Sequence, residues 1–412
     1  MCFSHIKQLW RGKKGCSKLR FINLSGSQYL MSTPDFTGVP DLLVLVLQGC
    51  TSLMEVHPSL GHLKKLCHLN MEYCKSIESL PPFTTSESLK YLKLSLCSGL
   101  KKFPEMEGNM KSLRELYLDG TSIEELPPSI ERLTGLTMLD LTDCKNLLHL
   151  PNTIGCLTSL KSLYLTGCSK IEEMPENLNG MKCLEKLTID GTSIRELSSI
   201  VGMKNLKNLS CGRCKCLVSE SFKGLALLSN LIELDLSYCN LMDGAILNDL
   251  SSLISLELLD LSGNCFVRLP ESISQFSKLT TLILSDCRQL QLLPKKLPLS
   301  LRDVFAQDCT SLTDYPNQIK VLNSWESGVT IVNSLNSPAQ VSEISRMLIF
   351  PRNEGESIAM RVTYEHAEGK QVDPLPLTTL QCLKEKEVVL SLSLSSFVFY
   401  VAVVRHYRTF CR

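Results

Sequence analysis

The chain contains 412 residues, with 43 Lys and Arg against 42 Asp and Glu, so its formal net charge is +1. This balance excludes a generally basic, phosphate-neutralising surface, and we do not expect nucleic acid as the main partner. Leucine alone accounts for 76 residues, whereas aromatic residues make up only 6%. Such dependence on one aliphatic residue is not typical of mixed globular domains and indicates a repeat.

The amino-terminal residues 1–18 are expected to form a lead-in or cap before the repeats. Their first ten residues contain no apolar run of seven or more, which argues against a secretory signal peptide. We therefore expect a cytoplasmic protein, with the nucleus as a second compartment, whose 19 cysteines stay reduced.

Residues 19–315 repeat the pattern L-x-x-L-x-L-x-x-C-x-x-L-x-x-L-P-x-x-I-x-x-L-x-x-L. Copies follow one another at intervals of 22 to 25 residues, which is typical of leucine-rich repeats. Thirteen copies open at Leu19, Leu42, Leu66, Leu89, Leu113, Leu136, Leu160, Leu184, Leu206, Leu231, Leu256, Leu279 and Leu301.

The alternating apolar residues of x-x-L-x-L-x-x predict a short strand with one buried face in each copy. One such strand cannot bury its leucines alone, but a parallel stack forms a continuous core. The second half of each copy returns along the convex side, where prolines such as Pro127, Pro151 and Pro270 oppose a long helix. We predict an α/β leucine-rich-repeat solenoid, a horseshoe with a parallel concave β-sheet, and a small C-terminal segment that is either irregular or β.

Nine cysteines occupy one repeat position directly after the strand, and an asparagine takes it in the eleventh copy. They are Cys50, Cys74, Cys97, Cys144, Cys168, Cys214, Cys239, Asn264, Cys287 and Cys309. Thr121 and Thr192 share the position, so it favours a small side chain that bonds to the backbone. We interpret these residues as a structural ladder. Disulfides and a zinc site at the C-x-x-C of 211–214 are the weaker alternatives, because partner thiols and a second ligand pair are lacking.

If the leucines at positions one, four and six of each copy point inward, positions three, five, seven and eight face the concave solvent. These positions are free of the repeat constraint, so we expect them to determine which partner binds. Early copies place tyrosines there, and later copies place carboxylates. The candidate partner-binding residues are His68, Tyr73, Tyr91, Lys93, Tyr117, Asp140, Tyr164, Asp190, Asp235, Asp260 and Asp286.

Two interpretations of the carboxylates remain open. The first is an acidic surface that docks a basic protein patch. The second is that they only keep the solenoid soluble, with basic residues such as Arg114 and Lys207 at position two reducing their field. No phosphate-binding loop, H-E-x-x-H, G-x-S-x-G elbow or dinucleotide fingerprint occurs, so we expect no enzymatic activity, no cofactor and no metal.

Longer phrases carry a more specific resemblance. They include I-K-Q-L-W-R-G at 6–12, L-V-L-Q-G-C-T-S-L at 45–53, and D-G-T-S-I at 119–123 and again at 190–194. On these phrases, residues 3–315 resemble the repeat region of plant disease-resistance receptors. The class is the one with an N-terminal Toll/interleukin-receptor domain, a nucleotide-binding switch and then leucine-rich repeats.

That resemblance implies an immune receptor whose repeats sense a pathogen effector or a guarded host protein and hold the nucleotide-binding switch inactive. Neither signalling domain is found within these 412 residues, so NAD cleavage and nucleotide exchange are not carried over. The chain is either part of a longer receptor or a stand-alone interaction scaffold or decoy without signalling domains.

Beyond residue 315 the repeat pattern ends. A partial β-sandwich is one interpretation of residues 316–387, because 350–362 weakly resembles the β-sandwich that follows the repeats in this class. The hydrophobic tail 388–412 opens with seventeen uncharged residues, which suit a buried strand or, at the lower limit of length, a membrane anchor. We do not expect a membrane partner.

Overall fold

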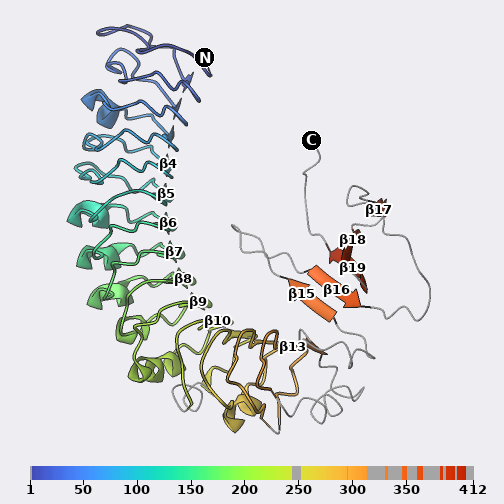
Figure 1. Ribbon diagram of the computed structural model, residues 1–412. Helices are drawn as coiled ribbons and strands as arrows, with labels where there is room; N and C mark the ends of the chain where they lie inside the picture. The colour runs from blue at the N-terminus through green and yellow to red at the C-terminus, as the bar shows by residue number, and fades with distance from the viewer. Residues whose placement is uncertain are drawn as a thin grey trace.

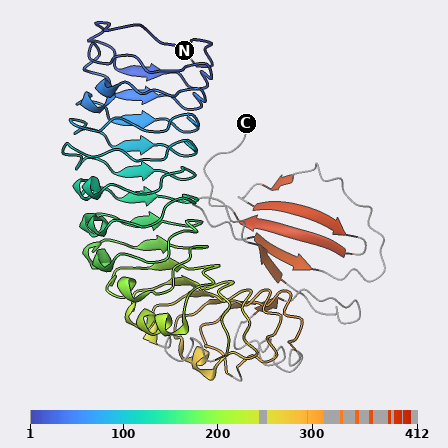
Figure 2. The same ribbon diagram turned by 60° about the vertical axis from the view of Figure 1, so that its left-hand side comes forward.

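The computed structural model describes residues 2–243, 252–294 and 296–312, together with six later strands. Short parallel strands stack in chain order along one side of an open arc, and the return segments line the other side (Figures 1 and 2). Each of the thirteen predicted copies supplies one three-residue strand. These are β1 (Phe21–Asn23), β2 (Val44–Val46), β3 (His68–Asn70), β4 (Tyr91–Lys93), β5 (Glu115–Tyr117), β6 (Met138–Asp140), β7 (Ser162–Tyr164), β8 (Lys186–Thr188), β9 (Asn208–Ser210), β10 (Glu233–Asp235), β11 (Leu258–Asp260), β12 (Thr281–Ile283) and β13 (Asp303–Phe305). The predicted leucine-rich-repeat solenoid is therefore confirmed.

The sheet continues one strand further than the leucine pattern predicts. Strand β14 (Thr330–Val332) pairs in parallel with β13, so the described sheet has fourteen strands. This strand falls in the segment that we interpreted as following the repeats. Its sequence lacks the spaced leucines that reveal the other thirteen.

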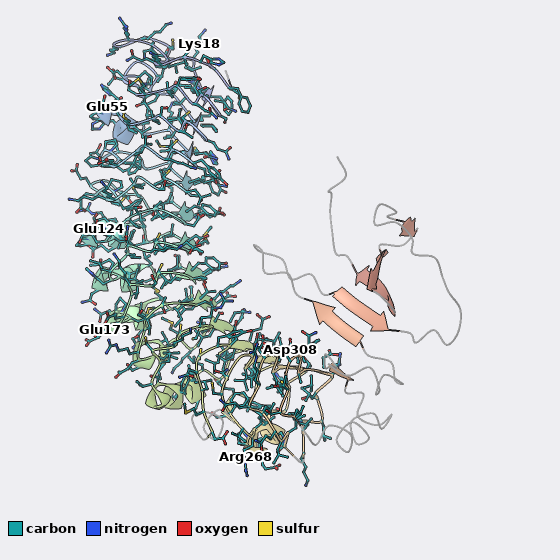
Figure 3. All side chains as sticks on the ribbon, in the orientation of Figure 1. Lys18, Glu55, Glu124, Glu173, Arg268 and Asp308 are labelled. Carbon is teal, nitrogen blue, oxygen red and sulfur yellow. The ribbon has the colours of Figure 1, made fainter. Side chains whose placement is uncertain are left out.

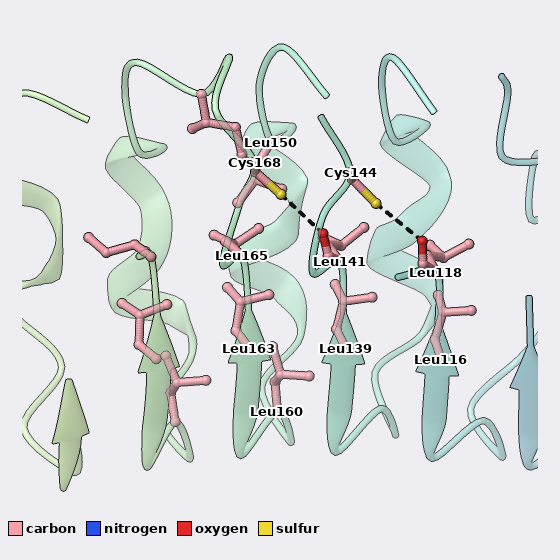
Figure 4. Packing of buried hydrophobic residues seen from close by; sticks show 14 of the residues in the cluster. Leu116, Leu118, Leu139, Leu141, Cys144, Leu150, Leu160, Leu163, Leu165 and Cys168 are labelled. Carbon is pink, nitrogen blue, oxygen red and sulfur yellow. Dashed lines mark hydrogen bonds between the residues drawn. The ribbon is translucent and has the colours of Figure 1, made fainter. Parts of the chain in front are cut away.

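The core is a set of leucine rows that run along the solenoid. Register pairing sets the central residue of each strand beside that of the next, as in Leu116, Leu139 and Leu163, all of which are fully buried (Figure 4). Burying one such side chain contributes about 1.5–3 kcal/mol. Because every row receives one residue from each copy, the hydrophobic contacts extend without interruption from copy to copy.

The cysteines of the repeated position link neighbouring copies through the backbone. The Cys144 thiol donates to the Leu118 carbonyl oxygen at 3.2 Å, and the Cys168 thiol donates to that of Leu141 at 3.0 Å (Figure 4). The other seven cysteines at this position also donate their thiols to a carbonyl oxygen of the preceding copy. They are Cys50, Cys74, Cys97, Cys214, Cys239, Cys287 and Cys309. Asn264 donates to the Leu236 carbonyl oxygen in the same way and also accepts from the Cys239 and Leu241 amides.

Threonine acts differently at this position. Thr121 and Thr192 donate to carbonyl oxygens of their own copies, those of Leu118 and Ile189.

Short 3-10 helices form the convex side. Four of them begin directly after a proline, at Pro127, Pro151, Pro175 and Pro270, and all of these except Pro175 are in extended conformation. The described helices are η1 (Pro58–His62), η2 (Pro128–Arg132), η3 (Asn152–Cys156), η4 (Glu176–Gly180), η5 (Ser198–Ile200), η6 (Ser219–Leu227) and η8 (Glu271–Gln275). The side chains of Glu124 and Glu173 lie on this outer side, whereas Asp308 lies on the inner side (Figure 3).

The first residues follow the path of a repeat's return half. The Phe3 amide donates to the Ser25 carbonyl oxygen at 2.7 Å, and the Cys16 amide donates to that of Gly38 at 2.8 Å. Trp10 packs edge-on against the buried Phe36 ring, with 6.4 Å between ring centroids. Residues 2–18 therefore add an incomplete turn beside β1.

A second, antiparallel sheet contains the remaining strands, in the order β15-β16-β19-β18-β17. They are β15 (Arg346–Ile349), β16 (Met360–Tyr364), β17 (Gln381–Leu383), β18 (Glu387–Leu394) and β19 (Phe397–Val404). The uncharged stretch 388–404 thus contributes to two paired strands. Within the described residues, no helix is long and apolar enough to cross a membrane.

Candidate protein-docking surface

The strands present two rows of side chains to the concave side, at positions three and five of each copy. In β4 to β7 the residues flanking the buried central leucine are exposed or half-buried. Parallel pairing in register sets Lys93 beside Tyr117, Tyr117 beside Asp140, and Asp140 beside Tyr164. Residues that lie 23 or 24 apart in the chain thereby become direct neighbours.

An aromatic and cationic cluster lies on β3 to β5. The His68 and Tyr91 rings have centroids 5.9 Å apart, and the Lys93 ammonium lies 4.8 Å from the centroid of the Tyr117 ring. The Tyr117 hydroxyl donates to a Glu115 carboxylate oxygen at 3.0 Å. Four of the predicted candidates are therefore brought together, while Tyr164 lies two strands further on with Lys186, 5.3 Å from its ring centroid.

Burial and charge shift the titration of this cluster. Burial, and then the hydrogen bond and charge of Glu115, raise the pKa of Tyr117 well above its usual range. Burial, and then the positive charge of Lys93, lower the pKa of His68. At neutral pH the cluster therefore presents a neutral phenol and a neutral imidazole.

The carboxylates at position five have a structural role that the sequence analysis did not assign. Asp140 accepts a hydrogen bond from the Thr142 amide at 2.9 Å, Asp235 from Ser237 at 2.8 Å, and Asp260 from Ser262 at 2.9 Å. Asn23 and Asn70 bond in the same way to the amide two residues later. An Asp or Asn two positions before a Ser or Thr, as in four of these five turns, is a signal for this turn. These side chains therefore cap the turn after the strand as well as carrying charge.

Asp190, at position seven, bridges neighbouring copies. One of its carboxylate oxygens accepts from the Gly212 amide at 2.9 Å and from the Ser210 hydroxyl at 2.5 Å, and the other accepts from the Thr166 hydroxyl at 3.0 Å. Its carboxylate is thus held in a fixed position by three donors.

Tyr73 and Asp286, at position eight, lie at the corner after the strand rather than on the sheet itself. Both have a left-handed backbone, with φ of 61° and 60°. In the C-terminal half of the arc, Arg213 lies 5.7 Å from the Tyr238 ring centroid, and the Tyr238 hydroxyl donates to Asp286 at 2.7 Å across an intervening copy. Tyr238 was not among the predicted partner-binding residues, although it shares its repeat position with Tyr73.

A shallow groove of about 380 Å³ lies along the opposite ends of the strands. Its lining includes Lys161, Glu185 and Lys207, and the last two form an ion pair at 2.8 Å. Lys207, expected to offset the acidic concave face, is therefore itself paired with a carboxylate.

The described cysteines are all free thiols. Within the C-x-x-C, Cys211 and Cys214 are buried core residues, and Cys216 is exposed. No group of three or more His, Cys, Asp or Glu able to hold a metal ion occurs within the described part of the chain.

Comparison with known proteins places these features in a family context. Residues 85–180 match the family model described as "Disease resistance protein RPS4B-like, leucine-rich repeats", and residues 230–253 and 255–276 match a general leucine-rich-repeat model. Over 306 residues the chain is 42% identical to TMV resistance protein N of Nicotiana glutinosa. The repeat region is homologous to that of the plant disease-resistance proteins. The resemblance seen in the sequence is confirmed.

These relatives are much longer than the part that aligns. The alignment with TMV resistance protein N spans 74% of this chain and 27% of that protein. Disease resistance-like protein DSC1 of Arabidopsis thaliana is 37% identical over 162 residues, which span 39% of this chain and 13% of the relative.

Solved structures show the fold alone, because their sequence identity is low. The leucine-rich-repeat protein LIC12759 of Leptospira interrogans has a TM-score of 0.51 at 22% identity, covering 76% of this chain and 96% of that one. A chain of the LRIM1/APL1C complex has a TM-score of 0.54 at 17% identity, covering 77% and 62%.

Proposed function

We propose that this chain is the protein-recognition and autoinhibitory leucine-rich-repeat region of a plant immune receptor. In this role it senses a pathogen effector or a guarded host protein and restrains a nucleotide-binding switch domain. The observation that carries the proposal is the 42% identity over 306 residues to TMV resistance protein N. We expect binding without turnover, in the cytoplasm or the nucleus.

The concave face supports a protein partner. It combines half-buried tyrosines with carboxylates that are held by hydrogen bonds to the turns, as at Asp140, Asp235 and Asp260. Tyrosine gives a large contact area at a small loss of conformational entropy, and fixed charges favour a partner of opposite sign. A basic protein patch is therefore the surface that fits this face.

Restraint of the switch is tested by supplying the parts separately. The full chain would be co-expressed in leaf tissue with the part of TMV resistance protein N outside the aligned residues, which by the class resemblance would hold the signalling portion. We expect the chain to co-precipitate with that portion and to lower any cell death seen when the portion is expressed alone. A chain that neither binds the signalling portion nor changes cell death would contradict the autoinhibitory role.

The alternative is a stand-alone interaction scaffold or decoy. It is favoured if the chain binds a protein through the concave face but leaves the signalling portion unbound and cell death unchanged.

A test of the acidic docking surface needs a substitution that removes the carboxylate charge but keeps the hydrogen bond to the turn. Asp235→Asn with Asp260→Asn retains an acceptor for the Ser237 and Ser262 amides, whereas lysine would remove it. We expect this double variant to bind a basic partner more weakly and with a smaller dependence on salt. Unchanged affinity and salt dependence would contradict the electrostatic part of the proposal.

A further inference from the structure

One row on the concave face combines two aromatic rings with a carboxylate between them. Tyr117 on β5, Asp140 on β6 and Tyr164 on β7 are direct neighbours in register, and all three are half-buried. Neighbouring strands lie about 4.8 Å apart, so the two tyrosine Cα atoms are about 10 Å apart with the aspartate midway. The register therefore places one tyrosine on each side of Asp140.

The outer sides of both rings are occupied by lysines of this chain. Lys93, from β4, lies over the Tyr117 ring and also approaches a Glu72 carboxylate oxygen at 3.8 Å, on the side away from β6. Lys186, from β8, lies over the Tyr164 ring. Strands β4 and β8 lie at the two ends of the row, next to β5 and β7. The opposite face of each tyrosine ring, toward β6, is therefore the face nearer to Asp140.

Asp140 brings negative charge to the centre of the row. Its Oδ1 accepts from the Thr142 amide, and no Lys, Arg or His among the described residues lies within 4.0 Å of its carboxylate oxygens. Glu115 and Asp119 lie close by, and the charge of Asp140 raises the pKa of both Tyr117 and Asp119. Glu72 and Glu115 also act on Tyr117, so the carboxylates outnumber Lys93 and Lys186 and the local field favours a cation.

We propose that Tyr117, Asp140 and Tyr164 form a subsite for the guanidinium group of an arginine side chain on a protein partner. The inference rests on the proposed function, because a docked protein must present this side chain. A guanidinium is planar, stacks on aromatic faces and donates parallel N–H groups to a carboxylate. An ammonium group has one compact charge and no planar face, so lysine fits this combination less well.

The subsite can be probed without knowing the partner. Met138 lies two residues before Asp140 on the same face of β6, so its methyl group is a reporter beside the row. The full chain, labelled with ¹³C at the methionine methyl groups, would be titrated with Nα-acetyl-arginine amide. We expect a saturating shift of the Met138 signal, while the buried Met71 signal stays in place as an internal reference.

An uncharged ligand and three variants of the chain test whether binding depends on the guanidinium charge, the Asp140 carboxylate and the Tyr164 ring. Nα-acetyl-citrulline amide has a similar shape without the charge and is expected to shift the Met138 signal at least tenfold less at equal concentration. Asp140→Asn keeps the acceptor for the Thr142 amide and is expected to weaken arginine binding at least fivefold, as is Tyr164→Leu. Asp143→Asn, at the exposed corner of the same copy, is expected to leave the binding curve unchanged.

The outcomes separate this inference from the proposed function. An unmoved Met138 signal, or an equal response to the citrulline compound, would overturn the subsite. An equal response to Nα-acetyl-lysine amide would overturn its assignment to guanidinium. If a protein partner still binds the concave face in either case, the proposed function stands without the subsite. If arginine amide binds as expected but no protein docks on this face, the proposed function fails, and the row is a guanidinium site without a protein partner.

Discussion

Each thiol of the cysteine ladder is a buried hydrogen-bond donor that reaches the backbone of the preceding copy. Burial raises the pKa of Cys97 and Cys144 to about 12, so these groups remain protonated at any physiological pH. A protonated thiol can donate, whereas a thiolate could not, and it is a poor nucleophile. Burial therefore also keeps Cys97 and Cys144 unreactive.

Removing one ladder donor should destabilise the solenoid. For Cys168→Ala we expect a loss of about 1–3 kcal/mol in the free energy of unfolding, because the Leu141 carbonyl loses a donor and a small cavity forms. Cys156→Ala is the matched control, since Cys156 is exposed on η3, and it should change stability by less than about 0.5 kcal/mol. Urea unfolding followed by circular dichroism measures both. Equal effects at the two positions would refute a structural role for the ladder.

At Asp119, burial disfavours the charged form of the carboxyl group. Burial raises the pKa of its carboxyl above the usual 3.8, and the Ser95 hydroxyl donates to it at 2.5 Å. The native state therefore binds the proton more tightly than the unfolded chain does. This contribution to stability is complete below pH 3.8 and is lost as pH rises through the folded-state pKa.

Asp119→Asn should consequently stabilise the protein at neutral pH. The amide keeps an acceptor for Ser95 and carries no charge to bury, so the melting temperature at pH 7 should rise above that of the wild type. The difference should shrink as pH falls toward 3.8. Asp143→Asn, at an exposed position, serves as the control in thermal scans from pH 3.5 to 8. A difference that does not depend on pH would contradict this account of Asp119.

At the scale of the repeat element, the corner after each strand requires a left-handed backbone. Glycine takes this position in six copies, as at Gly191 and Gly263, while Tyr238 and six other non-glycine residues adopt the same conformation. A left-handed backbone costs a non-glycine residue about 1–2 kcal/mol. The Tyr238 ring lies over Gly263 of the next copy, where a Cβ atom would overlap it. A large corner side chain and a following glycine thus form one packing unit.

The corner unit can be tested with two glycine substitutions. Gly191→Ala, with no close neighbour at its Cβ, should lose only the conformational term of about 1–2 kcal/mol. Gly263→Ala should lose about 2–4 kcal/mol, because the methyl group also displaces the Tyr238 ring. Adding Tyr238→Ala to Gly263→Ala should recover the extra loss, as a double-mutant cycle in chemical denaturation would show. Purely additive effects would rule out the contact.

The same elements show what the sequence could and could not predict. Leucines at fixed spacing predict the thirteen strands, because a three-residue strand with one buried face has few other ways to hide Leu139 or Leu163. β14 was missed because Thr330–Val332 offers no such leucine. The ring contacts of Lys93 and Lys186 depend on register between strands that are distant in the chain. The hydrogen bonds of Asp235 and Asp260 to their turns could have been predicted from the Asp-x-Ser spacing. They were missed because these residues were interpreted by their charge alone.

At the scale of the whole molecule, each copy packs mainly against its two neighbours, with the Tyr238–Asp286 hydrogen bond as a contact that spans one copy, so stability is close to a sum of copies and interfaces between them. The concave surface of β4 to β8 is therefore only as rigid as the leucine rows directly beneath it. A defect in one row should loosen adjacent copies more than distant ones, unlike in a globular domain with a single core.

Leu163→Ala tests this locality, because Leu163 is fully buried at the centre of β7. We expect a loss of about 2–5 kcal/mol, with amide hydrogen exchange accelerated most in β6 to β8 and little in β1 to β3. Leu148→Ala, at a leucine that is 52% exposed, should leave the exchange pattern unchanged. Uniform acceleration across all copies would mean that the solenoid unfolds as one cooperative unit. Partner recognition would then depend on every repeat rather than only on the copies that carry Tyr117, Asp140 and Tyr164.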